Sequence, residues 1–573
     1  MNNYNYAMFP SAPNTLDFYK TGHQDQYPEG TTRVVSNFTA RSNKHANVPG
    51  DSVVFVGLQY FIREYIEKAW NKWFQLPEDV ALGHYRERMD GSLGPGRASI
   101  EHLRALHRLR YLPIEIRALP EGTHVPLNVP MLTIHNTDPN FSWLPNFLET
   151  ALSSYLWMPC TSATTARAYR KLLDKFCELT GSPEDFTPFQ GHDFSARGMA
   201  GPHAAAMSGM GHLTFFKGTD TVLAIDLVED NYLTDKDYLI GGSVAATEHS
   251  VMCMGGDGED EIDTFRRLIT EIYPDGIVSI VSDTWDFWKV IGEYADILKT
   301  DILGRDGKVV FRPDSGDPAD ILCGSKIPTI KADTYEMFVV EASEIIEDDV
   351  RDNTPHGECG PDYEKQLFRW NGDVYEVSVD FYWNRHDKMY YYIDGADTSL
   401  VDKVTLTPEQ KGAVEVLWDL FGGTETDTGY KLLDSHVGLI YGDSITYERA
   451  QDILKRLADK GFASANVVFG IGSYTYQMVT RDTWGMAMKA TYGEIRGIPK
   501  DIYKDPVTDS GLKKSHKGLL FVDDELNLTQ GVDWDKFTSL ENALRVVWHN
   551  GTFTRLTNFK TVRENAIKGI TND

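Results

Sequence analysis

One local pattern occurs four times in the later part of the chain and constrains its fold more than any other feature. An apolar, β-branched run ends in a polar or glycine-containing turn, and a helix-type spacing of apolar residues follows. The four segments are residues 276–291, 307–318, 437–461 and 466–482. Strands that alternate with helices form parallel βα units, so the series predicts a barrel or a doubly wound sheet. The four turns would then lie at one edge of the sheet.

The second of these segments, GKVVFRPDSGDP at residues 307–318, ends in a turn with several polar and charged residues. Val309 to Phe311 predict a buried strand, and the turn after them carries one cation, carboxylates, a hydroxyl and a glycine. Parallel α/β proteins place their chemistry at such strand ends. The alternative is an ordinary turn, because proline, aspartate, serine and glycine are common turn formers.

The first part of the chain predicts a different kind of structure. Residues 111–137 contain short β-type runs separated by proline and glycine, which predict a small antiparallel sheet. The spacing of apolar residues predicts helices over 54–73 and 141–180. Residues 325–430 are first acidic and then rich in alternating aromatic residues with Asn-Gly and Asp-Gly turns, so we interpret them as an insertion that contains hairpin strands.

Together these patterns predict an α/β protein. It would consist of an irregular TIM-like α/β barrel, an accessory α+β domain built from N- and C-terminal segments, and an insertion. Five segments are expected along the chain. Residues 1–185 would belong mostly to the accessory domain, 186–324 and 431–500 to the barrel, 325–430 to the insertion, and 501–573 again to the accessory domain.

Composition excludes several classes of function. The formal net charge of −28 argues against binding nucleic acid through a broad basic surface, but not against a locally cationic pocket for a small anion. No apolar run reaches the roughly 18 residues of a transmembrane helix. The first residues of the sequence have neither a basic region nor an apolar core, so no signal peptide is expected. The five cysteines are scattered without CxxC spacing, which favours a reducing, cytoplasmic location and argues against a zinc site.

Side chains of four chemical types gather in the predicted turns. Carboxylates at neighbouring strand ends suit Mg²⁺, which takes oxygen ligands and bridges phosphates. Glycine turns that open helices present N–H groups to a phosphate, and arginines bind phosphate or carbonyl oxygens. An aromatic pair suits a flat ring. The candidates are Asp220, Asp283, Asp314 and Asp443; Arg197, Arg312, Arg481 and Lys489; Gly442 and Gly472; Phe194 and Tyr19.

These residue types together predict three kinds of ligand, namely a phosphorylated sugar, a metal ion and a planar heterocycle. The loop within 503–520 is the densest cationic stretch of the chain, and either closes over phosphates or is an ordinary solvated loop. Its lysines are Lys504, Lys513, Lys514 and Lys517. The GxG at 470–472 does not predict a dinucleotide site, because the third glycine and a downstream acid are missing.

A set of motifs occurs in an order that resembles one known family. Along the chain they are LDFYK, QYP, PIEIRALPEG, NTDP, HDFSARG, KGTDT, SVAATEHS, SIVSD, RPDSG, GDS, FGIG followed by TRD, and KDPVTD. The set covers residues 14–325 and 431–570 and is far more specific than any single motif. It resembles the nicotinamide phosphoribosyltransferases, which are type II phosphoribosyltransferases.

The resemblance implies a reaction of nicotinamide with 5-phosphoribosyl-1-pyrophosphate that yields nicotinamide mononucleotide and pyrophosphate, a step of NAD salvage. It also implies a homodimer with shared active sites. Phe194, together with Tyr19 of the second subunit, would stack on the pyridine ring. Arg312 would bind the carboxamide oxygen, and Asp220 would accept a hydrogen bond from the carboxamide nitrogen. A carboxylate at that place repels nicotinate, whose ring substituent is also a carboxylate.

The other implied roles concern phosphates, ribose and ATP. Asp283 and Asp314 would lie near Mg²⁺. His249 would be phosphorylated by ATP as a coupled substrate, with Glu248 orienting its imidazole. On the residues alone a hydrogen-bonded structural histidine is the favoured interpretation, and the SVAATEHS motif reverses it. The remaining expected contacts are Gly442 and Asp443 at the ribose; Gly472, Ser473 and Arg481 at the 5′-phosphate; Arg41, Lys489, Lys504 and Lys513 at other phosphates; and Arg197, Ser243 and Ser279 nearby.

The chain departs from the family pattern at three turns and in the insertion. The glycine-rich turn is FGIGSY at 469–474, the ribose turn is GDS at 442–444, and Met478 replaces a lysine before TRD. The 325–430 insertion is longer than in vertebrate members. These departures affect the expected details of phosphate binding and of subunit contacts, and leave the expected reaction unchanged.

Three alternatives stay open at this point. A nicotinate phosphoribosyltransferase would share the fold, although Asp220 within KGTDT argues against it. A barrel glycosidase could use the paired carboxylates, but it would need neither the cations nor the glycine turns. A non-catalytic binding protein on the same fold is disfavoured by the complete set of expected catalytic residues.

Overall fold

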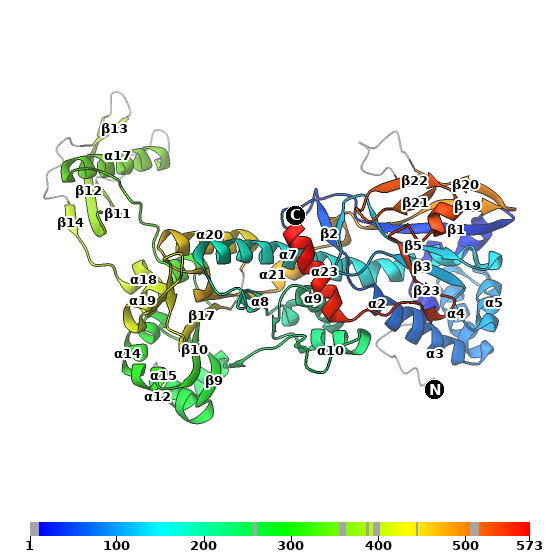
Figure 1. Ribbon diagram of the computed structural model, residues 1–573, viewed down its shortest axis with the longest axis horizontal. Helices are drawn as coiled ribbons and strands as arrows, with labels where there is room; N and C mark the ends of the chain where they lie inside the picture. The colour runs from blue at the N-terminus through cyan, green and yellow to red at the C-terminus, as the bar shows by residue number, and fades with distance from the viewer. Residues whose placement is uncertain are drawn as a thin grey trace. The chain divides into compact units, whose positions relative to one another are not determined.

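The computed structural model describes residues 11–255, 260–354, 363–384, 389–392, 401–442, 445–504 and 515–572. The chain divides into two compact units. Unit 1 contains Met1–Val244, Tyr441–Gln451 and Val467–Asp573, and unit 2 contains Ala245–Ile440 and Asp452–Asn466. Figure 1 shows both units and labels many of their helices and strands. The five-segment division expected from the sequence stays a prediction.

Unit 1 contains a seven-stranded antiparallel sheet in the order β20-β19-β1-β5-β3-β23-β24. Its strands are β1 (Thr31–Thr39), β3 (Ile114–Ala118), β5 (Pro130–Asn136), β19 (Ala487–Ile495), β20 (Ile498–Asp501), β23 (Arg545–His549) and β24 (Thr552–Phe553). The antiparallel sheet predicted within 111–137 is therefore confirmed. Its flanking strands come from both ends of the chain, a pairing that short-range sequence patterns do not encode.

Long helices of unit 1 follow the predicted spacing closely. The helix predicted over 141–180 is confirmed as α7 (Glu149–Thr180), which ends where Gly181 adopts a left-handed φ of 61°. The helix predicted over 54–73 begins only at Leu58, because Ser52–Val54 form β2. It consists of α2 (Leu58–Phe61), η3 (Ile62–Ala69) and α3 (Trp70–Gln75).

Unit 1 contains several further helices. They are α1 (His23–Gln26), α4 (Glu78–Leu93), α5 (Glu101–Leu109), α6 (Leu144–Phe147), α8 (Thr187–Gln190), α9 (Pro202–Leu213), α10 (Val222–Asn231), α22 (Trp534–Thr538) and α23 (Phe559–Asn572). Helix α9 packs closely on α7, because a Cβ atom at Gly211 would lie only 2.6 Å from the carbonyl oxygen of Pro159. Two further strand pairs are β2 with β4 (His124–Pro126) and β21 (Leu519–Val522) with β22 (Leu528–Val532).

Parallel strands are present in both units. In unit 1, β6 (Gly191–Asp193) lies between β7 (Gly218–Thr219) and β18 (Val467–Ile471). In unit 2 the order is β17-β10-β9-β8, with β8 (Ala245–Ala246), β9 (Asp275–Val281), β10 (Asp306–Arg312) and β17 (Val437–Tyr441). The fold is therefore mixed α/β with parallel strands of half-barrel type. Strand pairing among the described residues does not close a full barrel.

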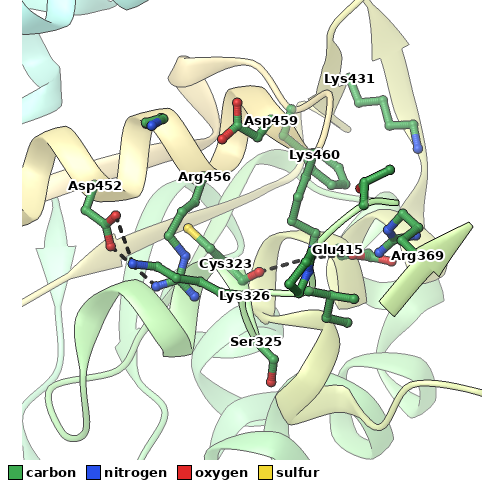
Figure 2. Close-up of a pocket in the computed structure, with 15 residues that line it drawn as sticks. Cys323, Ser325, Lys326, Arg369, Glu415, Lys431, Asp452, Arg456, Asp459 and Lys460 are labelled. Carbon is green, nitrogen blue, oxygen red and sulfur yellow. Dashed lines mark hydrogen bonds and ion pairs between the residues drawn. The ribbon is translucent and has the colours of Figure 1, made fainter. Parts of the chain in front are cut away.

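Each of the four predicted βα units is present. Polar turns follow β9, β10 and β18, and a helix comes after each of the four strands. These helices are α13 (Phe287–Lys289), α16 (Pro318–Cys323), α20 (Tyr447–Asp459) and α21 (Ser473–Gln477). Within unit 2, Lys460 follows α20 and donates to the carbonyl oxygen of Cys323 at 2.9 Å, which attaches α20 to the loop after α16 (Figure 2).

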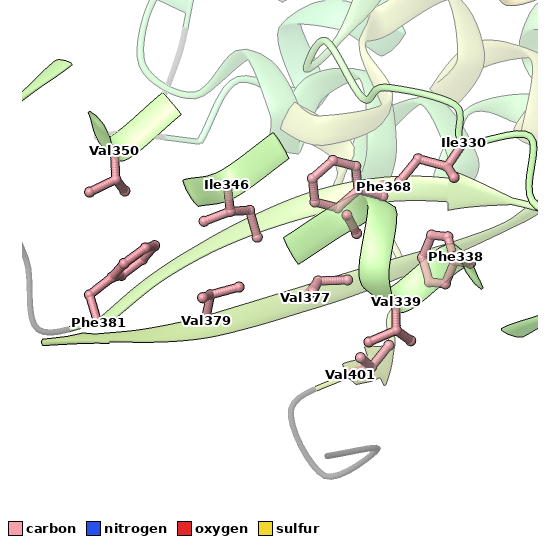
Figure 3. Close-up of a cluster of buried hydrophobic side chains, with 11 residues drawn as sticks. Ile330, Phe338, Val339, Ile346, Val350, Phe368, Val377, Val379, Phe381 and Val401 are labelled. Atoms are coloured by element: carbon pink, nitrogen blue, oxygen red, sulfur yellow. The ribbon is translucent and has the colours of Figure 1, made fainter. Parts of the chain in front are cut away.

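The segment 325–430 has a hydrophobic core of its own. Helix α17 (Tyr335–Asn353) lies on the hairpin of β11 (Tyr363–Trp370) and β12 (Asp373–Asn384). Phe338 and Ile346 of the helix are fully buried in a cluster with Val377 of the sheet (Figure 3). Asn371 and Gly372 form the turn with φ values of 48° and 85°, as a type I′ turn requires, so the Asn-Gly hairpin is confirmed. The second predicted turn, Asp-Gly at 394–395, lies outside the described residues.

Unit 2 contains further short helices and strands. They are α11 (His249–Gly255), α12 (Ile262–Arg267), α14 (Ala295–Ile297), α15 (Lys299–Leu303), β13 (Met389–Tyr392), β14 (Val401–Lys403), α18 (Pro408–Lys411), α19 (Ala413–Phe421), β15 (Gly423–Glu425) and β16 (Lys431–Leu433). Over the described part of both units, no helix combines the length and apolarity needed to cross a membrane.

Candidate active site

In unit 1, two predicted site residues follow neighbouring parallel strands. Phe194 comes directly after β6 and Asp220 directly after β7, and these strands pair in register through Asp193 and Thr219. The backbone N–H of Asp220 donates to the carbonyl oxygen of Asp193 at 3.0 Å, which ties the two strand ends together. The aromatic ring and the carboxylate therefore lie at one edge of the sheet, as the sequence predicted.

The carboxylate of Asp220 is held by two side chains. The Ser243 hydroxyl donates to Asp220 Oδ1 at 2.5 Å, and His192 Nε2 lies 2.9 Å from the same oxygen. The His192 ring also lies beside the Phe194 ring, with 4.6 Å between centroids. The Asp220 side chain keeps 43% of its surface exposed, so its carboxylate is oriented and yet accessible to a ligand. His192 is the residue of this group that sequence reasoning missed, although it stands in the HDFSARG motif.

Gly470 of β18 allows Phe194 to approach the sheet. A Cβ atom at this glycine would lie 2.7 Å from the Phe194 ring and 2.6 Å from the carbonyl oxygen of Tyr441, distances that real Cβ contacts do not show. The backbone N–H of Phe194 also donates to the carbonyl oxygen of Ile471 at 3.0 Å. The first glycine of the FGIG motif thus shapes the place of the aromatic ring, a role different from the phosphate contact expected of Gly472.

The turn at Gly472 and Ser473 packs against the turn that carries Arg197. A Cβ atom at Gly198 would lie 2.0 Å from Ser473 Oγ, so the two turns are in direct contact. Arg197 is exposed. Ser473 opens α21, and Gly472 as its N-cap provides no side-chain cap. The turn that carries Arg197 and the turn of Gly472 and Ser473 are therefore neighbours at a helix start, whose N–H groups favour an anion, and the expected phosphate contacts stay predictions.

A second group of cations surrounds Lys489 on β19. Loss of hydration lowers the pKa of the Lys489 ammonium, the carboxylate of Glu149 opposes this effect, and repulsion by nearby cations lowers the pKa further. The cations named in order of effect are Arg41, Lys20 and Arg481. Arg41 also donates through Nε to the carbonyl oxygen of Gly485 at 3.0 Å. Three of the predicted phosphate-binding cations therefore share one region of an otherwise acidic chain.

Several predicted residues are placed without a test of their role. Tyr19 is 61% exposed in η2 (Phe18–Gly22), where its ring lies 5.5 Å from the His23 ring. Lys504 is exposed, and Gly442 directly follows β17. Asp443, Lys513 and Lys514 lie outside the described residues. Their expected roles stay predictions.

In unit 2, Asp283 and Asp314 meet at the ends of β9 and β10. The two strands are parallel, with Arg312 opposite Val281 in register, so the turns that follow them begin side by side. Asp283 Oδ2 accepts hydrogen bonds from the backbone N–H of Asp314 at 2.9 Å and from the Ser315 hydroxyl at 2.6 Å. The turn of the RPDSG motif is therefore built around the Asp283 carboxylate.

Arg312 points from the end of β10 toward the end of β8. Its guanidinium donates to the carbonyl oxygen of Thr247, and its Nε lies 3.9 Å from Asp314 Oδ1. The Nε atom is buried without a hydrogen-bond partner among the described residues, and so is the hydroxyl of Ser279 on β9. Buried polar atoms normally have partners, so both atoms are candidates to meet a ligand or water.

His249 is joined to the same carboxylate. It opens α11, and its Nε2 lies 3.3 Å from Asp283 Oδ1. The Asp283 side chain is 5% exposed and the His249 side chain 50%. Glu248 was expected to orient the imidazole, but its carboxylate instead accepts a hydrogen bond from the Ser250 hydroxyl. Adjacent residues at the start of a helix point in different directions. The residue next to the His249 ring is therefore Asp283, which follows β9, and not its sequence neighbour Glu248.

Known proteins were compared with the whole chain. A model of the nicotinate phosphoribosyltransferase (NAPRTase) family matches residues 189–345 and 394–551, and a model of the nicotinamide phosphoribosyltransferase N-terminal domain matches residues 14–72. A nicotinamide phosphoribosyltransferase of Acinetobacter baylyi is 47% identical over 89% of this chain and 88% of its own length. The chain belongs to the nicotinamide phosphoribosyltransferase family. It is accordingly an enzyme of the glycosyltransferase class, and the resemblance noted in the sequence is confirmed.

More distant relatives extend the comparison. A nicotinamide phosphoribosyltransferase of Mycoplasma pneumoniae is 28% identical over 86% of this chain and 92% of its own length. Among solved structures, the nicotinate-nucleotide pyrophosphorylase of Pyrococcus furiosus is 14% identical, with a TM-score of 0.49 over 100% of this chain and 98% of that one.

Members of the nicotinamide phosphoribosyltransferase family act on phosphorylated substrates, so we tested whether the described residues fit a Mg²⁺ ion. No group of three or more His, Cys, Asp or Glu side chains arranged for a metal occurs among them. Asp283 and Asp314 are two adjacent carboxylates, of which the Asp314 side chain is 31% exposed. Mg²⁺ is commonly held by one or two carboxylates together with water and substrate phosphates, so the pair fits the ion as a partial ligand set.

A buried carboxyl group beside this pair escaped sequence reasoning. Glu261 is 1% exposed, and its Oε2 has no hydrogen-bond partner among the described residues. Burial raises the pKa of the Glu261 carboxyl to about 7, and the nearby carboxylate of Asp283 adds to this rise. No motif of the nicotinamide phosphoribosyltransferase family marked it, because its burial arises only when α12 packs against the strand ends.

Glu261→Gln is expected to stabilise the protein at alkaline pH. The unfolded carboxyl ionises near 4.5 and the folded one near 7, so Glu261 supports folding fully below pH 4.5 and progressively less as the pH rises through 7. Glutamine removes this loss, which should raise the free energy of unfolding at pH 8 by about 1–3 kcal/mol and leave little gain at pH 5. Urea unfolding at both pH values tests this.

The exposed Glu271→Gln variant is the matched control for this measurement, since Glu271 lies in the same unit but in contact with solvent. A Glu261→Gln variant with the same pH dependence as the parent enzyme would contradict the prediction.

Proposed function

We propose that this enzyme transfers the phosphoribosyl group of 5-phosphoribosyl-1-pyrophosphate to nicotinamide and so makes nicotinamide mononucleotide and pyrophosphate for NAD salvage. The observation that carries the proposal is the Asp220 carboxylate, held by Ser243 and His192 next to the Phe194 ring. An aromatic face and an oriented hydrogen-bond acceptor are what an aromatic amide needs for recognition.

Selectivity for the amide over the acid follows from charge. The nicotinamide substituent donates an N–H hydrogen bond to Asp220, whereas the carboxylate of nicotinate would face a like charge. A site built to accept a hydrogen bond disfavours a substrate that cannot donate one, because the site's polar atoms then lose their partner. The predicted contact of Arg312 with the carboxamide oxygen, and that of Tyr19 with the ring, belong to this proposal.

The chemistry requires positioning and charge stabilisation, and no general base. The bond between C1 of ribose and the pyrophosphate oxygen breaks with its electron pair on pyrophosphate, and the ring becomes oxocarbenium-like. The pyridine nitrogen has a free electron pair and no proton to lose when it forms the new bond to C1. Cations assigned to the phosphates, Arg41, Arg481 and Lys489 among them, would stabilise the negative charge of the leaving group.

We assign Mg²⁺ to the region of Asp283 and Asp314. Two adjacent carboxylates support this assignment, since Mg²⁺ in phosphoryl and pyrophosphoryl enzymes usually takes one or two carboxylates and completes its shell with phosphate oxygens and water. When bound, the ion would neutralise charge on the pyrophosphate. Asp283 would in addition keep the Asp314 turn in place through its hydrogen bond to the Asp314 N–H.

We further propose that ATP phosphorylates His249. Its half-exposed imidazole next to the buried carboxylate of Asp283 supports this role, because a carboxylate beside the ring fixes its orientation. In this step the new P–N bond forms as the bond between the γ-phosphorus and the bridging oxygen breaks, and ADP leaves. Hydrolysis of the phosphohistidine would return the free imidazole and phosphate.

The proposal includes a homodimer in which Tyr19 of one subunit contributes to the site of the other, and an irregular α/β barrel of TIM type around the parallel strands. The exposure of Tyr19, at 61%, supports the shared site of the homodimer.

The proposal also includes a reducing, cytoplasmic compartment. Four cysteines are free thiols, namely Cys160, Cys177, Cys253 and Cys323, and all but Cys253 are buried. The free thiols support a reducing compartment.

The purified enzyme with 5-phosphoribosyl-1-pyrophosphate and Mg²⁺ tests the reaction. Nicotinamide is expected to give nicotinamide mononucleotide, measured by mass spectrometry, with a kcat/KM at least about a hundredfold above that for nicotinate. A higher kcat/KM for nicotinate than for nicotinamide would contradict the proposed substrate.

The role of His249 has a test of its own. ATP is expected to raise the yield of nicotinamide mononucleotide in the parent enzyme, and His249→Ala should lose this stimulation while retaining the ATP-independent reaction. Labelled γ-phosphate should appear on the parent enzyme and not on the variant. An equal stimulation by ATP in both proteins would refute the phosphohistidine.

A further inference from the structure

A pocket of about 670 Å³ opens within unit 2, away from the residues assigned to phosphoribosyl transfer. Its walls come from the loop after α16, from α20, from Lys431 at the start of β16 and from Arg369 near the end of β11 (Figure 2). None of the residues that the sequence predicted for the substrates lines it. Small-molecule sites have volumes of roughly 300–1,000 Å³, so the pocket has room for a ligand of ordinary size.

The pocket carries positive charge in a chain whose formal net charge is −28. Six lining residues are cationic and three are anionic, which gives a formal balance of +3. The cations are Lys326, Arg369, Lys431, Lys455, Arg456 and Lys460, and the anions are Glu415, Asp452 and Asp459. Cations concentrated in a concave site of an acidic protein raise the local concentration of anionic ligands.

Three of these cations already have partners that hold the pocket wall. Lys460 lies 2.5 Å from Glu415 Oε2 and donates to the carbonyl oxygen of Cys323. Arg456 pairs with Asp320 at 2.9 Å and with Asp452 at 3.4 Å. Lys326 lies 3.3 Å from Asp452. These bonds pre-organise α20 and the loop after α16 around the cavity.

The other three cations are available to a ligand. Neither Arg369, Lys431 nor Lys455 forms an ion pair with a carboxylate among the residues that the structure describes. Lys431 instead stands over the rings of Trp418 and Phe462, with its ammonium 5.5 and 5.3 Å from their centroids. A guanidinium and two ammonium groups around one cavity match an anion with several oxygens, since arginine binds phosphate through two parallel bonds and lysine acts as a point charge.

We propose that this pocket is a second, non-catalytic site for a small molecule that carries two or more phosphate groups. The cations that remain without a carboxylate set the charge of the ligand, and the apolar walls at Ile327, Pro328 and Phe462 leave space for its uncharged part. Arg369 belongs to the 325–430 insertion, whereas Lys431 and Lys455 flank it. A bound polyphosphate would therefore connect the insertion to α20, which gives the insertion a binding role.

Sodium tripolyphosphate is a suitable probe, and isothermal titration calorimetry of the full-length enzyme is the measurement. The double variant Arg369→Gln/Lys455→Gln removes two cations without breaking an observed ion pair. We expect it to lose one class of binding sites, with affinity at least about tenfold weaker, because charge-assisted hydrogen bonds to phosphate are lost. Arg481→Gln, which affects the proposed catalytic phosphate site, should keep this class and lose the other.

Two further variants keep the result interpretable. Lys431→Gln should weaken the same class by itself, so the conclusion does not depend on the folding of the double variant. Lys299→Gln, a lysine of the same unit that does not line the pocket, should bind like the parent enzyme. Binding that is unchanged in both pocket variants, or a single class of sites that disappears with Arg481→Gln, would overturn the proposal.

Discussion

Asp283→Asn is expected to lower kcat for nicotinamide mononucleotide formation by about a hundredfold or more, because a preorganised charge at the pyrophosphate end of the reaction is lost. The asparagine oxygen can still accept from the Asp314 N–H and the Ser315 hydroxyl, bonds of 2.9 and 2.6 Å in the parent enzyme, so the turn should keep its shape. The variant removes the negative charge that faces His249 and the proposed Mg²⁺. Steady-state kinetics at saturating substrates provide the measurement.

Glu248→Gln is the matched control for Asp283. It removes a carboxylate directly beside His249 in sequence, but one that accepts its hydrogen bond from Ser250. Its kcat should stay close to the parent value, because this carboxylate is bonded to Ser250 and not to His249. Both variants should unfold at similar temperatures. A folded Asp283→Asn variant with the kcat of the parent enzyme would contradict a catalytic role for Asp283.

Asp220→Asn is expected to weaken the distinction between nicotinamide and nicotinate. The kcat/KM for nicotinamide should fall by about tenfold to a hundredfold, because an oriented acceptor becomes an amide that can also donate. The kcat/KM for nicotinate should rise, since its carboxylate no longer meets a like charge. The ratio of the two kcat/KM values, measured on the same preparation, should move toward nicotinate by about a hundredfold.

Asp226→Asn on α10 is the appropriate control, because this aspartate is exposed on the helix that follows the KGTDT motif. Its selectivity ratio should equal that of the parent enzyme. An unchanged kcat/KM ratio in Asp220→Asn would mean that the carboxylate held by Ser243 and His192 does not distinguish nicotinamide from nicotinate.

Sequence patterns predicted those parts of the fold that depend on local periodicity. The strands β9, β10, β17 and β18 occur where apolar runs stop at polar turns, and α7 follows its helical spacing to the glycine that ends it. The Asn371-Gly372 hairpin was predictable because only a few residues tolerate positive φ at both turn positions. Local conformational preference is sufficient in each of these cases.

Long-range pairing was not predictable in the same way. The antiparallel sheet places β1 between β5 and β19, whose residues lie far apart in the chain, and no single segment encodes that order. Register also decides which side chains meet. Arg312 opposite Val281 in parallel strands is what brings the Asp283 and Asp314 turns together. A sequence motif gives information only about its own residues, whereas strand register depends on the packing of the whole sheet.

For the recurring strand-and-turn pattern, the sequence by itself determined where each strand stops, which polar side chains follow it, and which family the motifs resemble. The tertiary structure decided which of those side chains are partners. It assigned Asp283 rather than Glu248 to His249, placed His192 and Ser243 on Asp220, and buried Glu261 beside the site. The physical reason is that hydrogen bonding and burial depend on distances across the fold, which only the packed chain determines.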